Sequence, residues 1–353
     1  MRTVTVKKEA VFTDSWDWCL KYFKPGAKDI YFTEDYVKLY ESDLDRSEAF
    51  VYREGESVFL FPYLKRTIDL LGGKYFDFET AYGYGGPLTN SPDGSFTERA
   101  VEEFCAQASA RNIVSGMIRF HPLMDNKDIF GGRCRAIFDR RTVAMDLRLD
   151  NERLLSEEIH SSSCRRNISK GAKSGLRYRV DEKMEGMPEF VKIYRSTMKR
   201  IGAGEFYLFS DGYFNGIKAL GKRACLVSVL LDDDTVAAAI ILKSEEFGHY
   251  HLSGSLEGSA DLKPNDFMVY NTALYLKGCG LKEFHLGGGS TRDPEDSLYQ
   301  FKARFSKRPY SFYIGRMIID EARYEEACAA WAGRYPALRD RYKDFVLKYR
   351  YRA

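Results

Sequence analysis

CLVSVLL (residues 225–231), VAAAIILK (236–243) and GHYHLS (248–253) are the three β-runs that decide the fold. Each run is far shorter than the ~20 residues of a membrane helix and has the length of a strand. Helical spacing over residues 265–277 follows, and then EFHL (283–286) stands directly before a run of three glycines. This order predicts a mixed sheet crossed by helices, an α/β (α+β) fold rather than a helix bundle.

The first half of the chain has the same mixed character. Its predicted elements are, in order, a hairpin of residues 48–52 and 57–64, a helix over 96–112, and strands at 113–120 and 142–149. Between them, the segment AYGYGGPL (81–88) contains three glycines and a proline, which excludes a continuing helix. We expect this tyrosine-edged loop to form one wall of a site.

Composition places the chain among globular proteins. Of its 353 residues, 44% are hydrophobic and 30% are charged, unlike disordered chains. This length predicts two domains, at about 150 residues each. The 54 basic and 51 acidic residues leave a net charge of +3, so any contact with a polyanion must be local. Seven cysteines without a CxxC pair, and a start (residues 1–12) without the apolar core of a signal peptide, predict reduced thiols in the cytoplasm.

Basic residues are concentrated in one segment of the second half. No acidic residue occurs between Glu158 and Asp181, and residues 164–173 are predicted to form a short helix. At 3.6 residues per turn, Arg166, Lys170 and Lys173 share one face of that helix. This face is either an anion-binding site or a solvated surface.

The end of the chain, residues 320–353, has a helical pattern that is broken near Gly333 and Pro336, and it is also strongly basic. Such a tail can contact RNA or an anionic membrane. The alternative is a docked helix with a solvated basic face, which the burial needed by its aromatic residues favours.

Three further motifs have ordinary explanations. Residues 216–222 read GxxxxGK, but Arg223 stands where a P-loop requires Ser or Thr, and a helix precedes the segment. His249 and His251 would share one side of a strand, yet no third ligand is apparent, so no metal is expected. Lys263 and Asn265 begin a helix, whose N–H groups can bind a phosphate; the alternative is an ordinary N-cap by Asn265 or Asp266.

Taken in order, the motifs resemble the Fem family, the peptidoglycan-bridge aminoacyltransferases and their relatives with a GNAT-like acyltransferase fold. The segments that carry the resemblance are YGYGGPL (82–88), RFHPL (119–123), SCRRNISKGAKSGL (163–176), YHLSGS (250–255), LGGG (286–289) and FKARF (301–305). The resemblance extends from about residue 30 to residue 316. It implies two tandem GNAT-like domains, residues 1–145 with the returning 317–353, and residues 146–316 with the transfer site. The long helical arm of several members has no room in residues 188–221.

This resemblance implies an acyl or aminoacyl N-transferase. The donor would be aminoacyl-tRNA or acyl-CoA, and the acceptor an amine of a nucleotide- or lipid-linked cell-wall precursor or a surface glycan, with no tightly bound cofactor and no metal. Lys302, in the Phe-Lys motif, would stabilise the reacting carbonyl oxygen or a donor phosphate, and Tyr250 would relay a proton. The remaining predicted site residues are Arg166, Lys170, Lys173, Lys263 and Asn265 for the donor, and Tyr82, Tyr84, Arg119 and Phe301 for the acceptor.

Two functions of other classes remain open. The fold can serve as a non-catalytic RNA- or nucleotide-binding module that uses the basic segment and the tail. It can also serve as a scaffold that the tail anchors to the inner membrane surface. The sequence leaves open which donor, acyl group and amine are used, and the oligomeric state.

Overall fold

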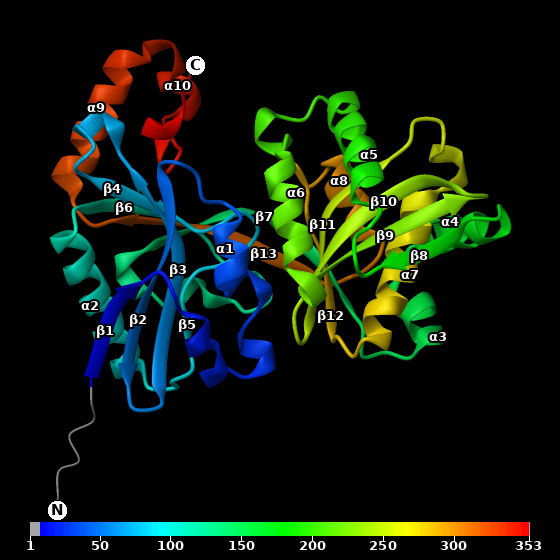
Figure 1. Cartoon of the computed structure of the whole chain (residues 1–353), viewed down its shortest axis with the longest axis horizontal. Coiled ribbons are helices and arrows are strands. Elements are labelled where there is room, and N and C mark those ends of the chain that lie inside the picture. Colours follow the sequence, from blue (N-terminus) through cyan, green and yellow to red (C-terminus); the bar gives the residue numbers. More distant parts are fainter. Residues whose placement is uncertain (1–7, 353) are drawn as a thin grey trace, which may run out of the picture. The chain divides into compact units, whose positions relative to one another are not determined.

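The computed structural model describes residues 8–352, and the chain divides into two compact units (Figure 1). The first unit ends at Asp139 and resumes at Phe312, while Arg140–Ser311 form the second. Both changes of unit fall a few residues before the domain boundaries expected from the sequence, which stay a prediction. The expectation that the start is not a signal peptide concerns residues 1–12, of which residues 1–7 lie outside the described part of the chain.

The first unit is built on a mixed sheet with strand order β1-β2-β3-β4-β6-β13. Its strands are β1 (Lys8–Thr13), β2 (Asp45–Glu54), β3 (Ser57–Thr67), β4 (Phe76–Glu79), β6 (Ile113–Arg119) and β13 (Pro309–Ile318), and the short β5 (Leu88–Thr89) pairs with β3. The hairpin expected from the sequence is β2–β3, which turns at Gly55 with a positive φ. The β4–β6 pair is parallel, and the other neighbours on this path are antiparallel.

Helices cover both faces of this first sheet. The helix α2 (Gly94–Ala110) packs on an aromatic core that includes Phe61, Phe78 and Phe104. Elsewhere, α9 (Glu321–Arg334) and the chain after it bury Trp331 and Tyr349 in a separate cluster. The tail is therefore docked through its apolar residues, as the amphipathic pattern favoured, and its helix ends at Arg334, within the break expected near Gly333 and Pro336. The short α1 (Glu34–Lys38) and α10 (Arg339–Tyr342) complete the unit.

The second unit has strand order β7-β12-β11-β10-β9-β8. The strands are β7 (Arg135–Asp146), β8 (Arg177–Asp181), β9 (Ala224–Leu231), β10 (Asp234–Lys243), β11 (Phe247–Ser255) and β12 (Glu283–Gly288). The three β-runs of the sequence form β9, β10 and β11, which pair antiparallel, and β12 adds in parallel to β11. The edge strand β8 was not expected, because its alternating charged residues lack an apolar run.

Two layers of helices cover this second sheet (Figure 1). On one face lie α4 (Ser162–Lys173) and α7 (Pro264–Gly278), packed so closely that a Cβ at Gly171 would be 3.0 Å from Phe267. Against β11 on the other face lies α5 (Met187–Arg200), where a Cβ at Gly254 would be 3.0 Å from the backbone of Tyr194. The remaining helices are α3 (Asn151–Arg153), α6 (Asp211–Ala219) and α8 (Ser297–Ala303).

No long helical arm occurs within residues 8–352. The chain between α5 and α6 is a ten-residue connection that contains a single short 3-10 turn at Glu205–Tyr207. The longest helix of that range, α2, has 17 residues. Among the helices that the structure describes, none combines the length and apolar character needed to cross a membrane.

Candidate active site

Lys302 on α8 is a buried cation whose partner is a backbone carbonyl. Its side chain is only 8% exposed, and its Nζ donates a hydrogen bond of 2.7 Å to the carbonyl oxygen of Gly288. Burial lowers the pKa of Lys302 to about 7, Asp296 opposes this shift, and Arg140 adds to it. An amine poised near neutral pH can act as a cation or as a proton acceptor, which is typical of a functional lysine.

The turn of three glycines explains why the Lys302 amine reaches the backbone. A Cβ at Gly288 would lie 2.6 Å from the carbonyl oxygen of Arg141, so a side chain does not fit there. Gly287 adopts a positive φ of 76° at the end of β12, which glycine tolerates without strain. The exposed carbonyls then accept two cations, because Arg140 Nη1 also donates to Gly289 at 2.7 Å.

Asp296 fixes the glycine turn to the helix that carries Lys302. One carboxylate oxygen accepts hydrogen bonds from the backbone N–H groups of Leu298 and Tyr299, which caps α8. The other accepts from the N–H groups of Ser290 and Thr291. Although burial raises the pKa of Asp296, these N–H donors hold it below the usual value. The sequence analysis missed Asp296; its place directly before a short helix is the signal that could have found it.

Phe301 and Phe305 flank Lys302 and pack with the core beneath α4 and α7. Their rings are 5.4 Å apart, and Phe305 is fully buried. The guanidinium of Arg304 lies 5.2 Å from the ring centre of Phe301. The aromatic pair therefore supplies the apolar surroundings that make ionisation of Lys302 costly.

Tyr250 lies on β11, the strand next to β12. Burial raises the pKa of its hydroxyl to about 12, with Ser253 acting in the opposite direction. The ring packs 6.4 Å from Phe284 in the core under α7. The phenol therefore stays neutral at physiological pH, and its O–H can donate a hydrogen bond.

The two strand histidines make different contacts, and the ring of His249 meets that of His285 on β12 edge-on, with centres 5.6 Å apart. Tyr250 pairs with Ile241 and Leu252 with Ile240, so a bulge at His251 interrupts the regular register that the sequence suggested. His251 Nε2 shares a hydrogen bond of 2.6 Å with the Tyr213 hydroxyl on α6. Burial, with a contribution from His249, lowers the pKa of His251 to about 3, so this ring is neutral at physiological pH.

The basic face expected on α4 is present. Ser161 caps the helix by accepting from the N–H of Cys164, and α4 begins at Ser162, two positions before the predicted start. Cys164, Ile168 and Gly171 are buried against the sheet, whereas the three predicted anion-binding residues are exposed: Arg166, Lys170 and Lys173. The charged side of α4 therefore faces away from the buried core.

The start of α7 differs from the expected N-cap. The helix begins at Pro264, and Lys263 is its N-cap in a left-handed conformation without a side-chain cap. Proline is favoured at a first helical position, so Asn265 and Asp266 both lie inside the helix, and the predicted cap by either residue is wrong. Asp266 is instead buried and bound by Asn167 of α4 at 3.1 Å. That bond places the basic helix beside the first turn of α7.

In the first unit, the predicted acceptor residues Tyr82 and Tyr84 lie in a tightly held loop. A Cβ at Gly83 would be 2.5 Å from the ring of Tyr31, so glycine is required there. The Tyr36 hydroxyl donates to the Tyr82 carbonyl at 2.7 Å. The ring of Tyr84 meets that of Tyr31 edge-on, with centres 5.4 Å apart.

Arg119 braces the same loop from β6. Its Nη1 donates to the Thr80 carbonyl at 2.7 Å and lies 3.5 Å from Glu79. Its own carbonyl accepts from the N–H of Gly85 at 2.7 Å. Arg119 thus makes structural contacts that the sequence did not reveal, and an acceptor role for it stays a prediction.

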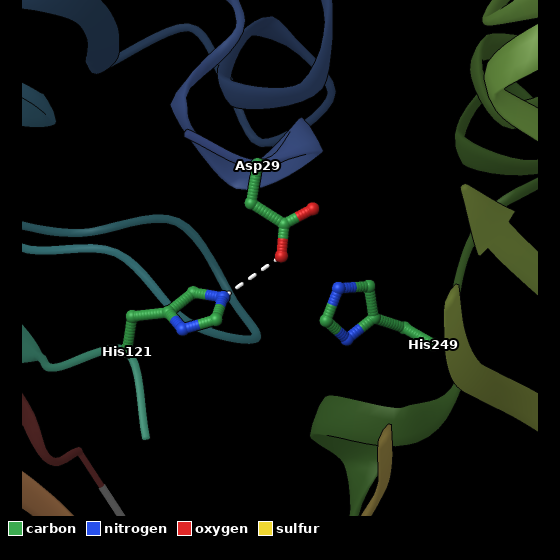
Figure 2. Close-up of side chains that lie close together, drawn as sticks. All are labelled: Asp29, His121 and His249. Carbon is green, nitrogen blue, oxygen red and sulfur yellow. Dashed lines mark hydrogen bonds and ion pairs between the residues drawn. The ribbon is translucent and has the colours of Figure 1, made fainter. Parts of the chain in front are cut away.

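A buried Asp29–His121 pair supports this loop and was also missed. Figure 2 shows the 2.8 Å hydrogen bond between Asp29 Oδ2 and His121 Nε2, both side chains having no exposed area. The His121 N–H donates to Asn126, whose amide nitrogen in turn donates to the carbonyls of Gly85 and Pro87. The RFHPL motif therefore fixes the backbone of the YGYGGPL motif.

A polar hollow of about 440 Å³ lies elsewhere in the first unit, and its lining includes Glu41, Arg46 and Lys65. None of the predicted site residues lines it. The hollow is open and its lining carries charges of both signs. We therefore assign the candidate active site to the surroundings of Lys302.

Comparison with known proteins shows which folds and sequences the chain is similar to. A family model described as an acetyltransferase (GNAT) domain matches residues 160–302, from just before α4 to Lys302 itself. The UDP-N-acetylmuramoylpentapeptide-lysine N(6)-alanyltransferase of Weissella viridescens is 22% identical over 280 residues, covering 73% of this chain and 81% of that protein. The crystal structure of FemX matches with a TM-score of 0.71 at 13% identity, over 90% of this chain and 99% of that one.

The chain is an acyltransferase that is similar to a muropeptide alanyltransferase and has the fold of FemX. The structure of L-PGS from Bacillus licheniformis also has this fold, with a TM-score of 0.55 at 12% identity over 89% of this chain and 94% of that one. The predicted fold class, α/β with tandem GNAT-like domains, is confirmed, as is the assignment of the chain to the acyltransferases. The individual site residues stay predictions.

Proposed function

We propose that the chain transfers an aminoacyl or acyl group from an activated donor to an amine of a nucleotide- or lipid-linked cell-wall precursor. The observation that carries this proposal is the buried Lys302, whose amine is held at the Gly288 carbonyl with a pKa of about 7. It stands at the end of the segment that matches a GNAT domain. The similarity to an alanyltransferase that acts on a UDP-linked muropeptide supports this class of acceptor.

In this proposal, Lys302 acts in its charged form. When an amine attacks an ester or thioester, negative charge develops on the carbonyl oxygen, and a fixed cation in an apolar site stabilises it strongly. A donor phosphate or the developing oxyanion raises the pKa of Lys302, because a nearby anion favours the charged form. Tyr250, neutral at physiological pH, relays the proton between the amine and the leaving group. Direct transfer needs no covalent enzyme intermediate.

The phosphate-rich donor would lie along α4 and the start of α7. The exposed side chains of Arg166, Lys170 and Lys173 supply positive charge, and Lys263 and Asn265 stand at the N-terminal end of the 15-residue α7. Either aminoacyl-tRNA or an acyl-CoA presents phosphates to such a surface. The acceptor would contact Tyr82, Tyr84, Arg119 and Phe301, and the reaction would take place in the cytoplasm.

A ligand panel followed by a transfer assay tests this function. Thermal unfolding is measured with coenzyme A, acyl-CoAs, charged and uncharged tRNA, and UDP-linked muropeptides, because a true ligand stabilises the folded state by mass action. Transfer is then followed with the stabilising donor and acceptor. We expect Lys302→Met to lose transfer by at least about a hundredfold, while the exposed Lys307→Met retains it. Normal turnover by a folded Lys302→Met protein would remove the role given to Lys302.

A non-catalytic polyanion-binding module is the second candidate, and the exposed, acid-free face of α4 favours it. Both candidates predict binding that weakens steeply with salt. They differ in chemistry, because the module binds tRNA or a nucleotide without transferring any group. Binding of charged tRNA with full retention of its aminoacyl ester in the presence of every acceptor would support the module.

A further inference from the structure

Four large apolar side chains are exposed around the connection between α5 and α6. Ile201 is 62% exposed, Phe206 55% and Leu208 53%, and Leu256 at the end of β11 is 40% exposed. Single exposed leucines are common on proteins, but a group of them marks an interaction site. We call these four residues the apolar patch.

Hydrogen bonds bring the parts of the apolar patch together. Arg200 Nη2 and the Thr197 hydroxyl both donate to the carbonyl of Ser255, so Leu256 follows directly from a residue bound to the end of α5. The Tyr194 hydroxyl donates to the carbonyl of Tyr207 at 2.8 Å, which ties the connection back to the helix. The backbone is thus held in place while the apolar side chains face solvent.

The charges around the apolar patch are mostly positive. Residues 192–223 contain seven basic side chains and two acidic ones, Glu205 and Asp211, and the exposed Glu257 follows Leu256. Asp211 is paired with Arg195 at 2.8 Å, which leaves Glu205 and Glu257 against exposed cations such as Lys199. Basic residues in the last turn of α5 also suit the helix dipole. That explanation accounts for Lys199 and Arg200 but not for the exposed Phe206 and Leu208.

We propose that the apolar patch docks the protein on an anionic phospholipid surface. Aromatic and aliphatic side chains inserted at the boundary between headgroups and acyl chains, with a basic rim facing the headgroups, form the usual interfacial binding pattern. Anionic lipids attract such a rim within about one Debye length. This inference goes beyond the proposed transfer reaction and does not depend on it, because docking requires neither donor nor acceptor.

Vesicle flotation of the full chain tests the docking. Vesicles of phosphatidylcholine alone are compared with vesicles that also contain phosphatidylglycerol, in low and moderate salt. We expect binding to the anionic vesicles only, and Phe206→Ser/Leu208→Ser to weaken it by about tenfold or more, since each side chain loses its apolar contact with lipid. Lys199→Gln should weaken binding less, and mainly at low salt. Leu44→Ser, at an equally exposed position (59%) in the first unit, is the matched control.

The tail requires its own comparison, because it too is basic. Deleting it would remove Val346, Leu347 and Tyr349 from a buried cluster and unfold the first unit. Point variants of its exposed cations, Arg341→Gln and Lys343→Gln, avoid this problem. The proposal is overturned if the parent does not bind anionic vesicles, or if binding depends on the tail variants and not on Phe206 and Leu208. The proposal is also overturned if the parent is a dimer and Phe206→Ser/Leu208→Ser makes it a monomer. The apolar patch would then bind a second copy of the chain.

Discussion

The two units each bury a charged centre, and the two centres are built in opposite ways. In the first unit, Asp77 has no exposed area and is contacted by Arg66 and Arg350, with a further hydrogen bond from Tyr349. In the second unit, Lys302 is almost as deeply buried but has a backbone carbonyl as its hydrogen-bond acceptor. The charge of Asp77 is compensated by two arginines, whereas the charge of Lys302 has no ion-pair partner of this kind within residues 8–352.

The difference appears in the pKa values. Burial alone would raise the pKa of Asp77, but Arg66 and Arg350 hold it below the usual range. For Lys302, burial dominates, and the pKa falls to about 7. A compensated centre stabilises a fold, since it fixes the tail residue Arg350 to β4, whereas an uncompensated one costs stability and is retained for its chemistry. The predictions below separate these two cases.

Breaking the Asp77 centre should have the largest effect on stability. Asp77→Asn removes the carboxylate that pairs with Arg350 and leaves Arg66 paired with Glu79 alone, and we expect a loss of about 3–5 kcal/mol in the free energy of unfolding. The matched control is Asp69→Asn, which breaks an exposed ion pair with Arg352 and should cost less than about 1 kcal/mol. Denaturant unfolding measures both. Similar losses for the two variants would contradict the role of Asp77.

The Asp77 centre also predicts sensitivity to acid. Because the pKa of Asp77 is lowered on folding, its contribution to stability is present above the pKa of the unfolded chain and is lost as the pH falls through the folded value. The free energy of unfolding should therefore fall less steeply below pH 4 in Asp77→Asn than in the parent, when measured at several pH values. Parallel pH curves would count against this linkage.

Lys302→Met should change stability in the opposite direction. The folded pKa of about 7 lies below the ordinary lysine value of 10.5, so only the unfolded chain holds the proton between these values. Stability of the parent therefore decreases as the pH falls from 10.5 to about 7 and is level below that. The methionine variant lacks this cost, and we expect it to gain about 1–3 kcal/mol over the parent at pH 7 but little at pH 10. A destabilised variant at pH 7 would show that the amine is compensated after all.

The basic face of α4 should affect binding alone. Arg166→Gln, Lys170→Gln and Lys173→Gln each remove an exposed cation, so the free energy of unfolding should stay within about 0.5 kcal/mol of the parent. Each should lower the slope of log affinity against log salt by about 0.7–0.9 for the phosphate-rich donor. Lys183→Gln, an exposed lysine of the same unit, is the control. Unchanged slopes in all three variants would place the donor elsewhere.

The sequence predicts the local parts of this account better than the long-range ones. The β2–β3 hairpin, the basic helix α4 and the glycine turn after β12 follow from neighbouring residues. The Asp77–Arg350 pair joins positions 273 residues apart, and no local pattern indicates it. The bulge at His251 and the left-handed N-cap at Lys263 depend on how strands and turns settle against their neighbours. The resemblance to the Fem family supplied Lys302, but its burial and its lowered pKa required the structure.

The pH dependence of kcat/KM for transfer, measured for the parent and for Lys302→Met, tests the central claim most directly. The value of kcat/KM reports ionisations of the free enzyme and of the free acceptor amine, which attacks only when it is unprotonated. When kcat/KM is calculated per unprotonated amine, the parent should therefore lose activity as the pH rises through about 7, where Lys302 loses its charge. Lys302→Met should be lower by at least about a hundredfold and should lack that step. A parent whose kcat/KM per unprotonated amine rises through pH 7, or a variant that keeps the parent's profile, would contradict the claim that Lys302 serves as a buried cation.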